Sequence, residues 1–413
     1  MVPSSGLPEA GSFVDRQAEL ATLRAKFAEA SAGRPRFVLV EGENGIGKTA
    51  LLQQFAGGTD GAHLLSASGD ESENLLQYGV VEQLCRSAKA PLPVELEAIT
   101  DRSSVLPEPF SVGKGLLEFL NTLHRGAPVV LVVDDAHLAD ASSQLALLFA
   151  FRRLQDCRVL AVLAVTEEPG TSLRSGLYRL VDSDAGTRIR LRSLGAPEIA
   201  ELATQLSGQA LSRRVVERLR DHTRGNPLHL RALIDELTLP SLGGSPEALW
   251  PAPQSFSLTV RDRLASCSPE ARRLVAAAAV VGMRCPFAVV RQLSGVEESL
   301  QPLQEAIEAH LVEYRQRERQ VSFGHPLVRA AVYHDLRVSE RAELHARAAL
   351  LVGDEAEALR HRAAAATEED EALAADLAAF AAREAARGSW ASAAAMFGKA
   401  ARLAAHGPQR EHM

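Results

Sequence analysis

The feature that most constrains this chain is a glycine-rich loop that joins one apolar run to the next. Residues 37–52 read FVLVEGENGIGKTALL, and Gly42, Gly47, Lys48 and Thr49 fill the pattern G-x-x-x-x-G-K-[ST] without a gap. Chance matching gives this pattern in roughly one chain in a hundred of this length, with glycine at about 7% of residues. A strand before the loop and a helix after it make a chance match rarer still, so the loop predicts nucleotide binding.

The spacing of these residues follows from the chemistry of a phosphate cradle. Glycines let the backbone turn tightly and bring several N–H groups around a phosphate, and the helix that follows adds the positive end of its dipole. Lys48 can reach the β- and γ-phosphates, and the Thr49 hydroxyl can hold Mg²⁺. The expected ligands are therefore ATP or ADP with Mg²⁺. The residues of the predicted cradle are Gly42, Asn44, Gly45, Ile46, Gly47, Lys48, Thr49 and Ala50.

A second polar cluster closes the apolar run 128–133. An uninterrupted apolar run is typical of a parallel strand buried on both faces, and ligands bind at the carboxyl ends of such strands. We expect Asp134 to hold Mg²⁺, and Asp135 to orient or deprotonate the attacking water, as the catalytic partner of Lys48. Taken alone, the two acids would equally fit a solvated strand end. His137 is expected to be a structural hydrogen-bonding residue and not a catalyst.

Strands and helices alternate over residues 37–194, which predicts an α/β fold with a doubly wound parallel sheet. Asp15 is expected to cap the first helix, and residues 90–109, which carry several prolines, are expected to be irregular. The expected strands are 37–40, 63–67, 129–133, 158–165 and 188–194, and the expected helices include 20–27, 50–55, 116–123, 144–154 and 197–206.

Beyond residue 195 the pattern becomes helical. Residues 240–254, rich in Pro, Gly and Ser, are expected to form a linker, and the alternating residues 312–323 to form a β-hairpin. Helices followed by a hairpin indicate a winged-helix module. Residues 385–400 resemble one tetratricopeptide-like hairpin, a unit that normally occurs in arrays of at least three. We therefore interpret the chain as a fragment, or as one that ends where such an array would begin.

Composition narrows the class of protein. The net charge of −7 argues against a broad basic surface that would hold nucleic acid. The four cysteines form no C-x-x-C pair, which favours reduced thiols over a disulfide or zinc framework. No leader pattern opens the chain, and no charge-free apolar run reaches about 18 residues. These features predict a cytoplasmic protein that does not enter a membrane.

Three further motifs make the chain similar to a known family, the STAND-type ATPases at the core of large ATP-binding LuxR-family transcriptional regulators. Residues 13–20 (FVDRQAEL) resemble the opening motif F-V-G-R-x-x-E-L of that family. Residues 134–140 (DDAHLAD) resemble its D-D-x-H-x-x-D motif, and residues 323–329 (FGHPLVR) resemble F-x-H-P-L-V-R. The resemblance covers about residues 13–350.

The resemblance implies roles for residues outside the phosphate loop. Val14 and Arg16 would lie beside the adenine, and Pro227 would pack against the base from a small helical domain. His325 would touch the β-phosphate of ADP and lock a closed form, although Pro326 replaces the acid that usually follows it. The implied domains are a P-loop nucleotide-binding domain (13–195), a helical lid with linker (196–250), a winged-helix domain (251–345) and a tetratricopeptide-like helical region (346–413).

Two positions depart from the family pattern. Asp15 replaces a glycine of the opening motif, a change that an exposed turn tolerates. Thr166 and Glu167 stand where many relatives place an arginine that senses the γ-phosphate, and Arg174 is a basic residue near them in the sequence. A glutamate would repel phosphate, so we expect nucleotide binding to persist and hydrolysis to be slow.

The sequence therefore predicts an ATP/ADP-dependent regulatory switch of a LuxR-type transcriptional regulator. It would self-associate when activated and respond to an inducer or protein partner at its helical tail. DNA would be bound only through a C-terminal helix-turn-helix that these 413 residues do not contain. One alternative is a nucleotide-binding signalling scaffold without a DNA role, such as the ATPase module of a cyclase or kinase. Another is an AAA-type remodelling enzyme, for which turnover of about 1 s⁻¹ or more is expected.

Overall fold

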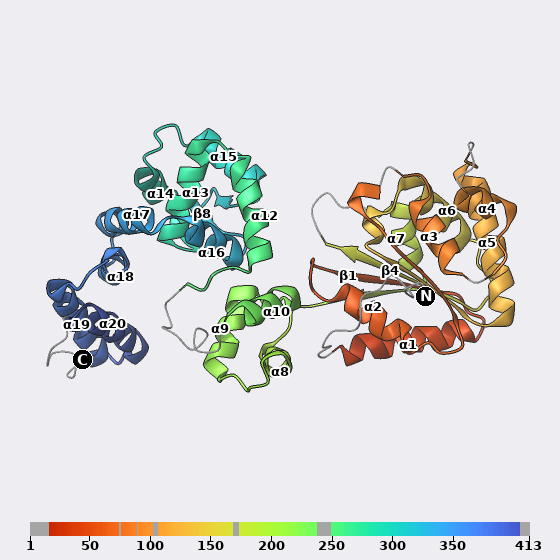
Figure 1. The fold of residues 1–413 in the computed structure, drawn as a ribbon, viewed down its shortest axis with the longest axis horizontal. Coiled ribbons are helices and arrows are strands. Elements are labelled where there is room, and N and C mark those ends of the chain that lie inside the picture. Colours follow the sequence, from red (N-terminus) through yellow and green to blue (C-terminus); the bar gives the residue numbers. More distant parts are fainter. Residues whose placement is uncertain are drawn as a thin grey trace. The chain divides into compact units, whose positions relative to one another are not determined.

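The protein was analysed as a computed structural model, in which the described residues form two compact units (Figure 1). The first unit holds the described residues up to Gln205 together with Asn226–Leu228. The second unit holds Leu206–Gly225 and the described residues from His229 onward. The structure describes residues 16–404 except 74–75, 89, 102–105, 168–172 and 238–248.

A five-stranded parallel sheet forms the centre of the first unit, with the strand order β2-β3-β4-β1-β5. This confirms the parallel sheet that the sequence predicts. Every residue of β3 is buried, as the uninterrupted apolar run requires. The strands are β1 (Arg36–Gly42), β2 (His63–Ser68), β3 (Val129–Asp134), β4 (Val159–Thr166) and β5 (Gly186–Arg190).

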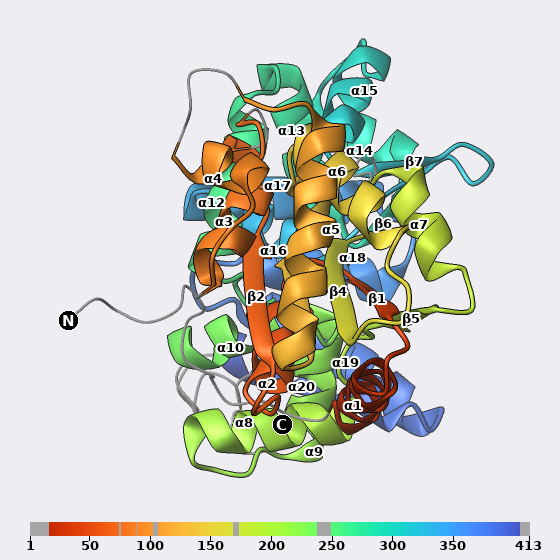
Figure 2. The same ribbon diagram turned by 90° about the vertical axis from the view of Figure 1, so that its right-hand side faces the viewer.

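Helices cover both faces of this sheet (Figures 1 and 2). Alternate residues of a strand point to opposite faces, so Val38 and Val40 pack with α1 and α2, whereas Phe37 and Leu39 pack with α3 to α7. Figure 2 views this unit with α5 in front of the strands. The helices are α1 (Gln17–Ser31), α2 (Lys48–Ala56), α3 (Gly79–Ser87), α4 (Val94–Thr100), α5 (Pro109–Gly126), α6 (Ala141–Phe151), α7 (Ser175–Val181) and α8 (Ala196–Ser207).

Two local predictions for this unit were wrong. Residues 90–109 are not wholly irregular, because α4 lies among their prolines. Pro93 stands at its N-cap, where a missing N–H costs nothing, and Leu96 and Ile99 are buried one turn apart. The N-cap of α1 is Arg16 and not Asp15. The first three residues of the opening motif, Phe13, Val14 and Asp15, lie outside the described residues.

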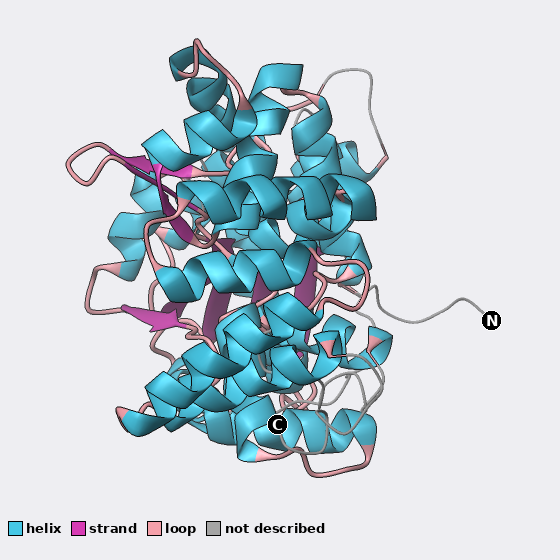
Figure 3. Ribbon diagram, turned by 90° about the vertical axis from the view of Figure 1, so that its left-hand side faces the viewer, coloured by secondary structure: helices cyan, strands magenta, loops and turns pink. Residues whose placement is uncertain are grey.

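Helices, coloured cyan in Figure 3, make up most of the second unit. A three-stranded antiparallel sheet, β6-β8-β7, accompanies them, and its β7–β8 pair confirms the predicted hairpin. The helices are α9 (Arg213–Thr223), α10 (Pro227–Glu236, which starts in the first unit), α12 (Gln254–Ala265), α13 (Pro269–Val281), α14 (Phe287–Ser294), α15 (Leu300–Glu308), α16 (Pro326–Asp335), α17 (Val338–Leu351), α18 (Glu355–Ala365), α19 (Glu371–Ala386) and α20 (Trp390–Leu403). The strands are β6 (Arg284–Pro286), β7 (Glu313–Arg315) and β8 (Gln320–Ser322).

Small side chains organise the core of the second unit. Ala276–Ala279 of α13 are buried, which lets α14, α15 and α16 pack closely around it. A smaller core joins α18, α19 and α20 through residues such as Leu377 and Met396. Most of the predicted linker at 240–254 lies outside the described residues, and α12 begins at Gln254. None of the helices in the described part of the chain combines the length and apolarity needed to cross a bilayer.

Candidate nucleotide site

The parallel sheet brings three polar segments of the first unit together at the carboxyl ends of its strands. In a parallel sheet the carboxyl ends of the strands lie together, and ligands bind there. β1 ends at Gly42 beside Thr166 of β4, and β3 ends at Asp134 on the other side of β4. The strand order therefore places the glycine loop, Asp134 and Thr166 at the same end of the sheet.

Backbone geometry shapes the glycine loop into a cradle. Gly45 and Gly47 have φ of +74° and +101°, in the left-handed region that side chains rarely adopt. A Cβ on Gly42 would lie 2.8 Å from the Ile46 side chain, which is itself buried in the core. Gly47 gives α2 no side-chain cap, so its first N–H groups remain suited to an anion, as a phosphate requires.

Lys48 is buried beneath this cradle, with 6% of the residue exposed. Its Nζ donates hydrogen bonds to the carbonyl oxygens of Gly42 and Glu43, both at 3.0 Å, and to Thr166 Oγ1 at 2.9 Å. The ammonium group is thus held by oxygens of β1, of the loop and of β4. Sequence reasoning gave Thr166 no role at the site; the available signal was a hydroxyl residue that ends a buried strand.

Thr49 and Asp134 meet as the prediction of a shared Mg²⁺ site requires. Thr49 Oγ1 donates to Asp134 Oδ2 at 2.5 Å. Burial raises the pKa of the Asp134 carboxyl above its usual value, while the bond from Thr49 acts in the opposite direction. A hydroxyl and a carboxylate are the hard oxygen ligands that Mg²⁺ takes together with phosphates and water. The residues present therefore fit the ion, which would draw phosphate oxygens to this corner of the cradle.

The next acid follows directly from the end of β3. Asp135 has a φ of +43°, and its N–H donates to Asp134 Oδ1 at 3.0 Å, which fixes the turn after the strand. His137 Nδ1 accepts a hydrogen bond from the Thr166 N–H at 3.4 Å. That contact ties the segment after β3 to the end of β4, in keeping with the structural role expected for His137.

Arg16 ties the start of α1 to the cradle. Its Nη2 donates to the carbonyl oxygens of Ile46 at 3.3 Å and Arg192 at 2.6 Å. Of the two opening-motif residues expected beside the adenine, Arg16 thus contacts the loop, and Val14 lies outside the described residues.

A segment far along the chain also binds the loop. Asn226 Nδ2 donates to the Asn44 carbonyl oxygen at 2.8 Å, and the Leu228 N–H donates to the Gly45 carbonyl oxygen at 3.3 Å. A Cβ on Gly45 would lie 2.7 Å from the Leu228 Cβ, so glycine is needed for this approach. The resemblance named Pro227 in this segment but missed Asn226. The sequence held a signal for Asn226, because the asparagine of a Gly-Asn-Pro turn is a frequent N-cap of the helix that follows.

The end of β4 differs from the expected phosphate-repelling arrangement. Glu167 Oε2 pairs with Arg190 Nη2 at 2.8 Å, so a cation on β5 balances its charge. Thr166, and not Glu167, contacts Lys48. Arg174 is exposed at the N-cap of α7, where its N–H donates to Gln144.

His325 belongs to the second unit and caps α16, where its Nδ1 accepts a hydrogen bond from the Leu327 N–H at 3.1 Å. Its ring packs against His229 and Phe256, with centroid separations of 5.6 and 6.0 Å. Burial, followed by the charge of Arg224, lowers the pKa of His325 to about 3, so the ring is neutral at pH 7. In this structure, therefore, His325 caps α16 and packs among aromatic side chains of the second unit.

With this geometry established, comparison with known proteins gives a class for the first unit. Residues 12–163 match the AAA ATPase domain. The chain therefore contains a nucleotide-binding P-loop ATPase module. No curated protein matches the chain at a significant level.

Three of the solved structures that match this chain show how low the sequence identity is. A Walker-type ATPase of Pyrococcus abyssi shares 12% identity with a TM-score of 0.44, over 78% of this chain and 96% of its own. A STAND protein with a tetratricopeptide repeat sensor from Pyrococcus horikoshii shares 15% (TM-score 0.39), over 95% of this chain and 59% of its own. The ADP form of the ORC2 protein of Aeropyrum pernix shares 15% (TM-score 0.44), over 84% and 97%. Similarity at this level is too low to assign a function to this chain.

Proposed function

We propose that this chain is an ATP/ADP-dependent conformational switch and the regulatory core of a LuxR-type transcriptional regulator. The nucleotide would be held by the cradle from Gly42 to Ala50, with Mg²⁺ between Thr49 and Asp134. Val14 and Arg16 would border the adenine, and Pro227 would pack against it.

The observation that carries the proposal is the contact between the loop and Asn226. Asn226–Leu228 belong to the first unit, whereas the rest of α10 belongs to the second. A phosphate that alters the Asn44 and Gly45 backbone therefore acts on the start of a helix that continues into the second unit. Such coupling favours a switch, because a ligand shifts an equilibrium only through contacts that differ between its states.

The end of β4 supports binding with slow turnover. Thr166 offers a hydroxyl to the site, and the next side chain, Glu167, is an acid already paired with Arg190. Fast phosphoryl transfer is usually helped by a cation that stabilises charge in the transition state. Asp135 would orient the attacking water and Lys48 would hold the phosphates, which gives weak hydrolysis that resets the switch.

The second unit would read the nucleotide state. Helices α12 to α15 and the β7–β8 hairpin support a winged-helix domain at 251–345, between a helical lid at 196–250 and a tetratricopeptide-like region at 346–413. His325 would reach the β-phosphate of ADP in the closed form, while ATP would open the protein for self-association. An inducer or protein partner would act at the helical region, and DNA would be bound by a helix-turn-helix outside these residues.

Calorimetric titration of the full chain with ADP and with ATP, each with Mg²⁺, tests this function. Lys48→Ala should abolish binding of both nucleotides; undiminished binding would refute the site. His325→Ala should weaken ADP binding more than ATP binding, and equal effects would remove His325 from the lock. His63→Ala is the matched control, since this exposed histidine begins β2 at the amino ends of the strands, away from the cradle. Circular dichroism verifies that each variant is folded.

A further inference from the structure

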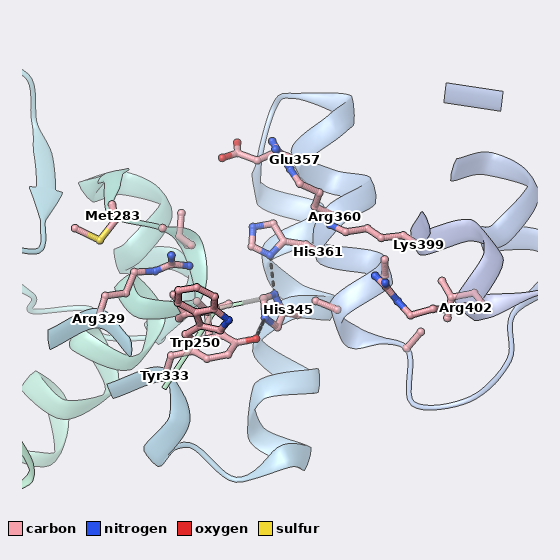
Figure 4. Close-up of a pocket in the computed structure, with 18 of the residues that line it drawn as sticks. Trp250, Met283, Arg329, Tyr333, His345, Glu357, Arg360, His361, Lys399 and Arg402 are labelled. Carbon is pink, nitrogen blue, oxygen red and sulfur yellow. Dashed lines mark hydrogen bonds between the residues drawn. The ribbon is translucent and has the colours of Figure 1, made fainter. Parts of the chain in front are cut away.

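The second unit contains a large pocket that the nucleotide site does not use. Its volume is about 1420 Å³ (Figure 4). Its walls come from α9, α13, α16, α17, α18, α20 and the segment before α12. Pockets for organic ligands usually measure about 300–1,000 Å³, so this one can hold a sizeable molecule.

A partly buried cation that has no ion-pair partner among the described residues lies in the wall. Arg329 of α16 donates from Nε to the Ala279 carbonyl oxygen at 2.9 Å. Among the described residues no carboxylate forms an ion pair with its guanidinium group. Burial lowers its pKa, which reflects the cost of holding a charge away from water. A charge that is partly withdrawn from water is stabilised by a nearby anion, and the pocket gives an anion access to Arg329.

The other charges of the lining leave room for an anionic ligand. Two more arginines, Arg360 and Arg402, line the pocket without an ion-pair partner in the described part of the chain. Carboxylates are present too, but Asp221 pairs with Arg220 and Glu368 is exposed. The basic lining residues are Arg218, Arg329, Arg360, Lys399 and Arg402, and the acidic ones are Asp221, Glu357, Glu368 and Glu369.

A chain of three hydrogen-bonded side chains faces the same space. Tyr333 Oη lies 2.9 Å from His345 Nε2, and His345 Nδ1 lies 2.8 Å from His361 Nδ1 (Figure 4). Burial lowers the pKa of each histidine to about 4, so both are neutral at pH 7. When Tyr333 donates to His345 Nε2, the single proton of neutral His345 lies on Nδ1 and is shared in a hydrogen bond with His361 Nδ1. His361 then carries its own proton on Nε2, and this N–H remains available as a donor. The pocket then presents an N–H group as well as arginines to an acceptor.

An apolar wall accompanies the polar one. Trp250, 5% exposed, together with Leu249 and Met283, lines the pocket near Arg329. A bound metal does not explain the site, because the described residues contain no group of three or more His, Cys, Asp or Glu side chains that could hold one.

We propose that this pocket binds an organic anion, with its carboxylate or phosphate group on Arg329 and His361 and its apolar body against Trp250. Arg329 stands one turn after His325 in α16, so an anion bound there would be an effector of the switch. That role rests on the function proposed above, whereas the binding does not.

Phenyl phosphate and phenylacetate serve as probes, titrated by calorimetry into the full chain, with phenol as the uncharged counterpart. The anions should bind and phenol should not. The anion that binds with the higher affinity identifies the preferred headgroup, phosphate or carboxylate. Arg329→Met should weaken binding about 10- to 100-fold, as loss of a hydrogen bond to a charged group implies. Arg315→Met, an exposed arginine of β7 outside the pocket, should leave binding unchanged.

Lys48→Ala separates the pocket from the nucleotide site. Probe binding that survives in Lys48→Ala but falls in Arg329→Met supports the pocket, whatever happens to nucleotide binding. Absence of anion binding to the unmodified chain, or equal affinity in Arg329→Met, overturns it. If Arg329→Met does not fold, Arg402→Met at the exposed rim takes its place, with an expected loss of about two- to fivefold, and unchanged affinity there has the same meaning.

Discussion

Asn226 provides the sharpest test of how the phosphate loop is held. The residue is buried, with 3% exposed, and makes two hydrogen bonds through one side chain. Its Nδ2 binds the Asn44 carbonyl oxygen at 2.8 Å, and its Oδ1 accepts from the Leu228 N–H at 3.0 Å. The first bond fixes the loop, and the second caps the start of α10.

Each of the two hydrogen bonds makes its own contribution to the free energy of unfolding. Loss of an asparagine cap costs about 1 kcal/mol. Asn44 is exposed, so water can replace part of the lost partner of its carbonyl, and that bond also contributes about 1 kcal/mol. In a unit of this size 1 kcal/mol shifts Tm by about 2–4 °C. Asn226→Ala should therefore lower the Tm of the first unit by about 4–8 °C.

Asn226→Ser is the matched variant, because serine keeps a helix cap but cannot reach Asn44. Its Tm should fall by about 2–4 °C. Calorimetric scans measure both variants, and titration with ADP should show affinity lowered by up to about fivefold if the bond pre-orders the loop. A serine variant with the Tm and ADP affinity of the unmodified chain would refute the reasoning, since the loop bond would then contribute nothing.

Two further predictions concern the cradle. Gly45→Ala should lower Tm more than Gly33→Ala. Both glycines have a positive φ, which costs alanine about 1–2 kcal/mol of stability, but only at Gly45 would a Cβ also meet Leu228. Equal losses of Tm in thermal scans would show that the approach of Leu228 is not tight. Asp134→Asn should stabilise the nucleotide-free protein at neutral pH and abolish Mg²⁺-dependent stabilisation by ADP. Burial raises the pKa of Asp134 in the folded protein above its value in the unfolded chain. The contribution of this group to stability is therefore complete below the usual aspartate pKa and is lost as pH rises through the raised value. Denaturation between pH 4 and pH 8 checks the sign, and a variant less stable than the parent at pH 8 would contradict it.

The sequence predicted the parts of the site that depend on local pattern. An apolar run that ends in Asp134, and glycines spaced before Lys48, already specify a strand end and a cradle. Contacts made by tertiary structure could not be read in this way. Asn226 reaches Asn44 across 182 positions, and Thr166 meets Lys48 only because β4 lies beside β1.

The same limit applied to α4 and α7 in the first unit. Prolines around α4 indicated an irregular segment, while the burial of Leu96 that stabilises the helix depends on its packing beside α5. In α7, seven residues are too few for a clear helical period, and packing of Leu177 against the sheet determines the structure.

The contacts of Lys48 support the proposal that this module binds nucleotide and hydrolyses it slowly. Its ammonium group is already bound by two carbonyl oxygens and the Thr166 hydroxyl, so an incoming phosphate takes its place among existing partners. We propose that Thr166 donates to a phosphate oxygen and so helps to distinguish ATP from ADP. A hydroxyl carries no charge, however, and gives little of the stabilisation that a transferring phosphoryl group needs. We therefore expect the end of β4 to favour detection of the γ-phosphate over its rapid removal.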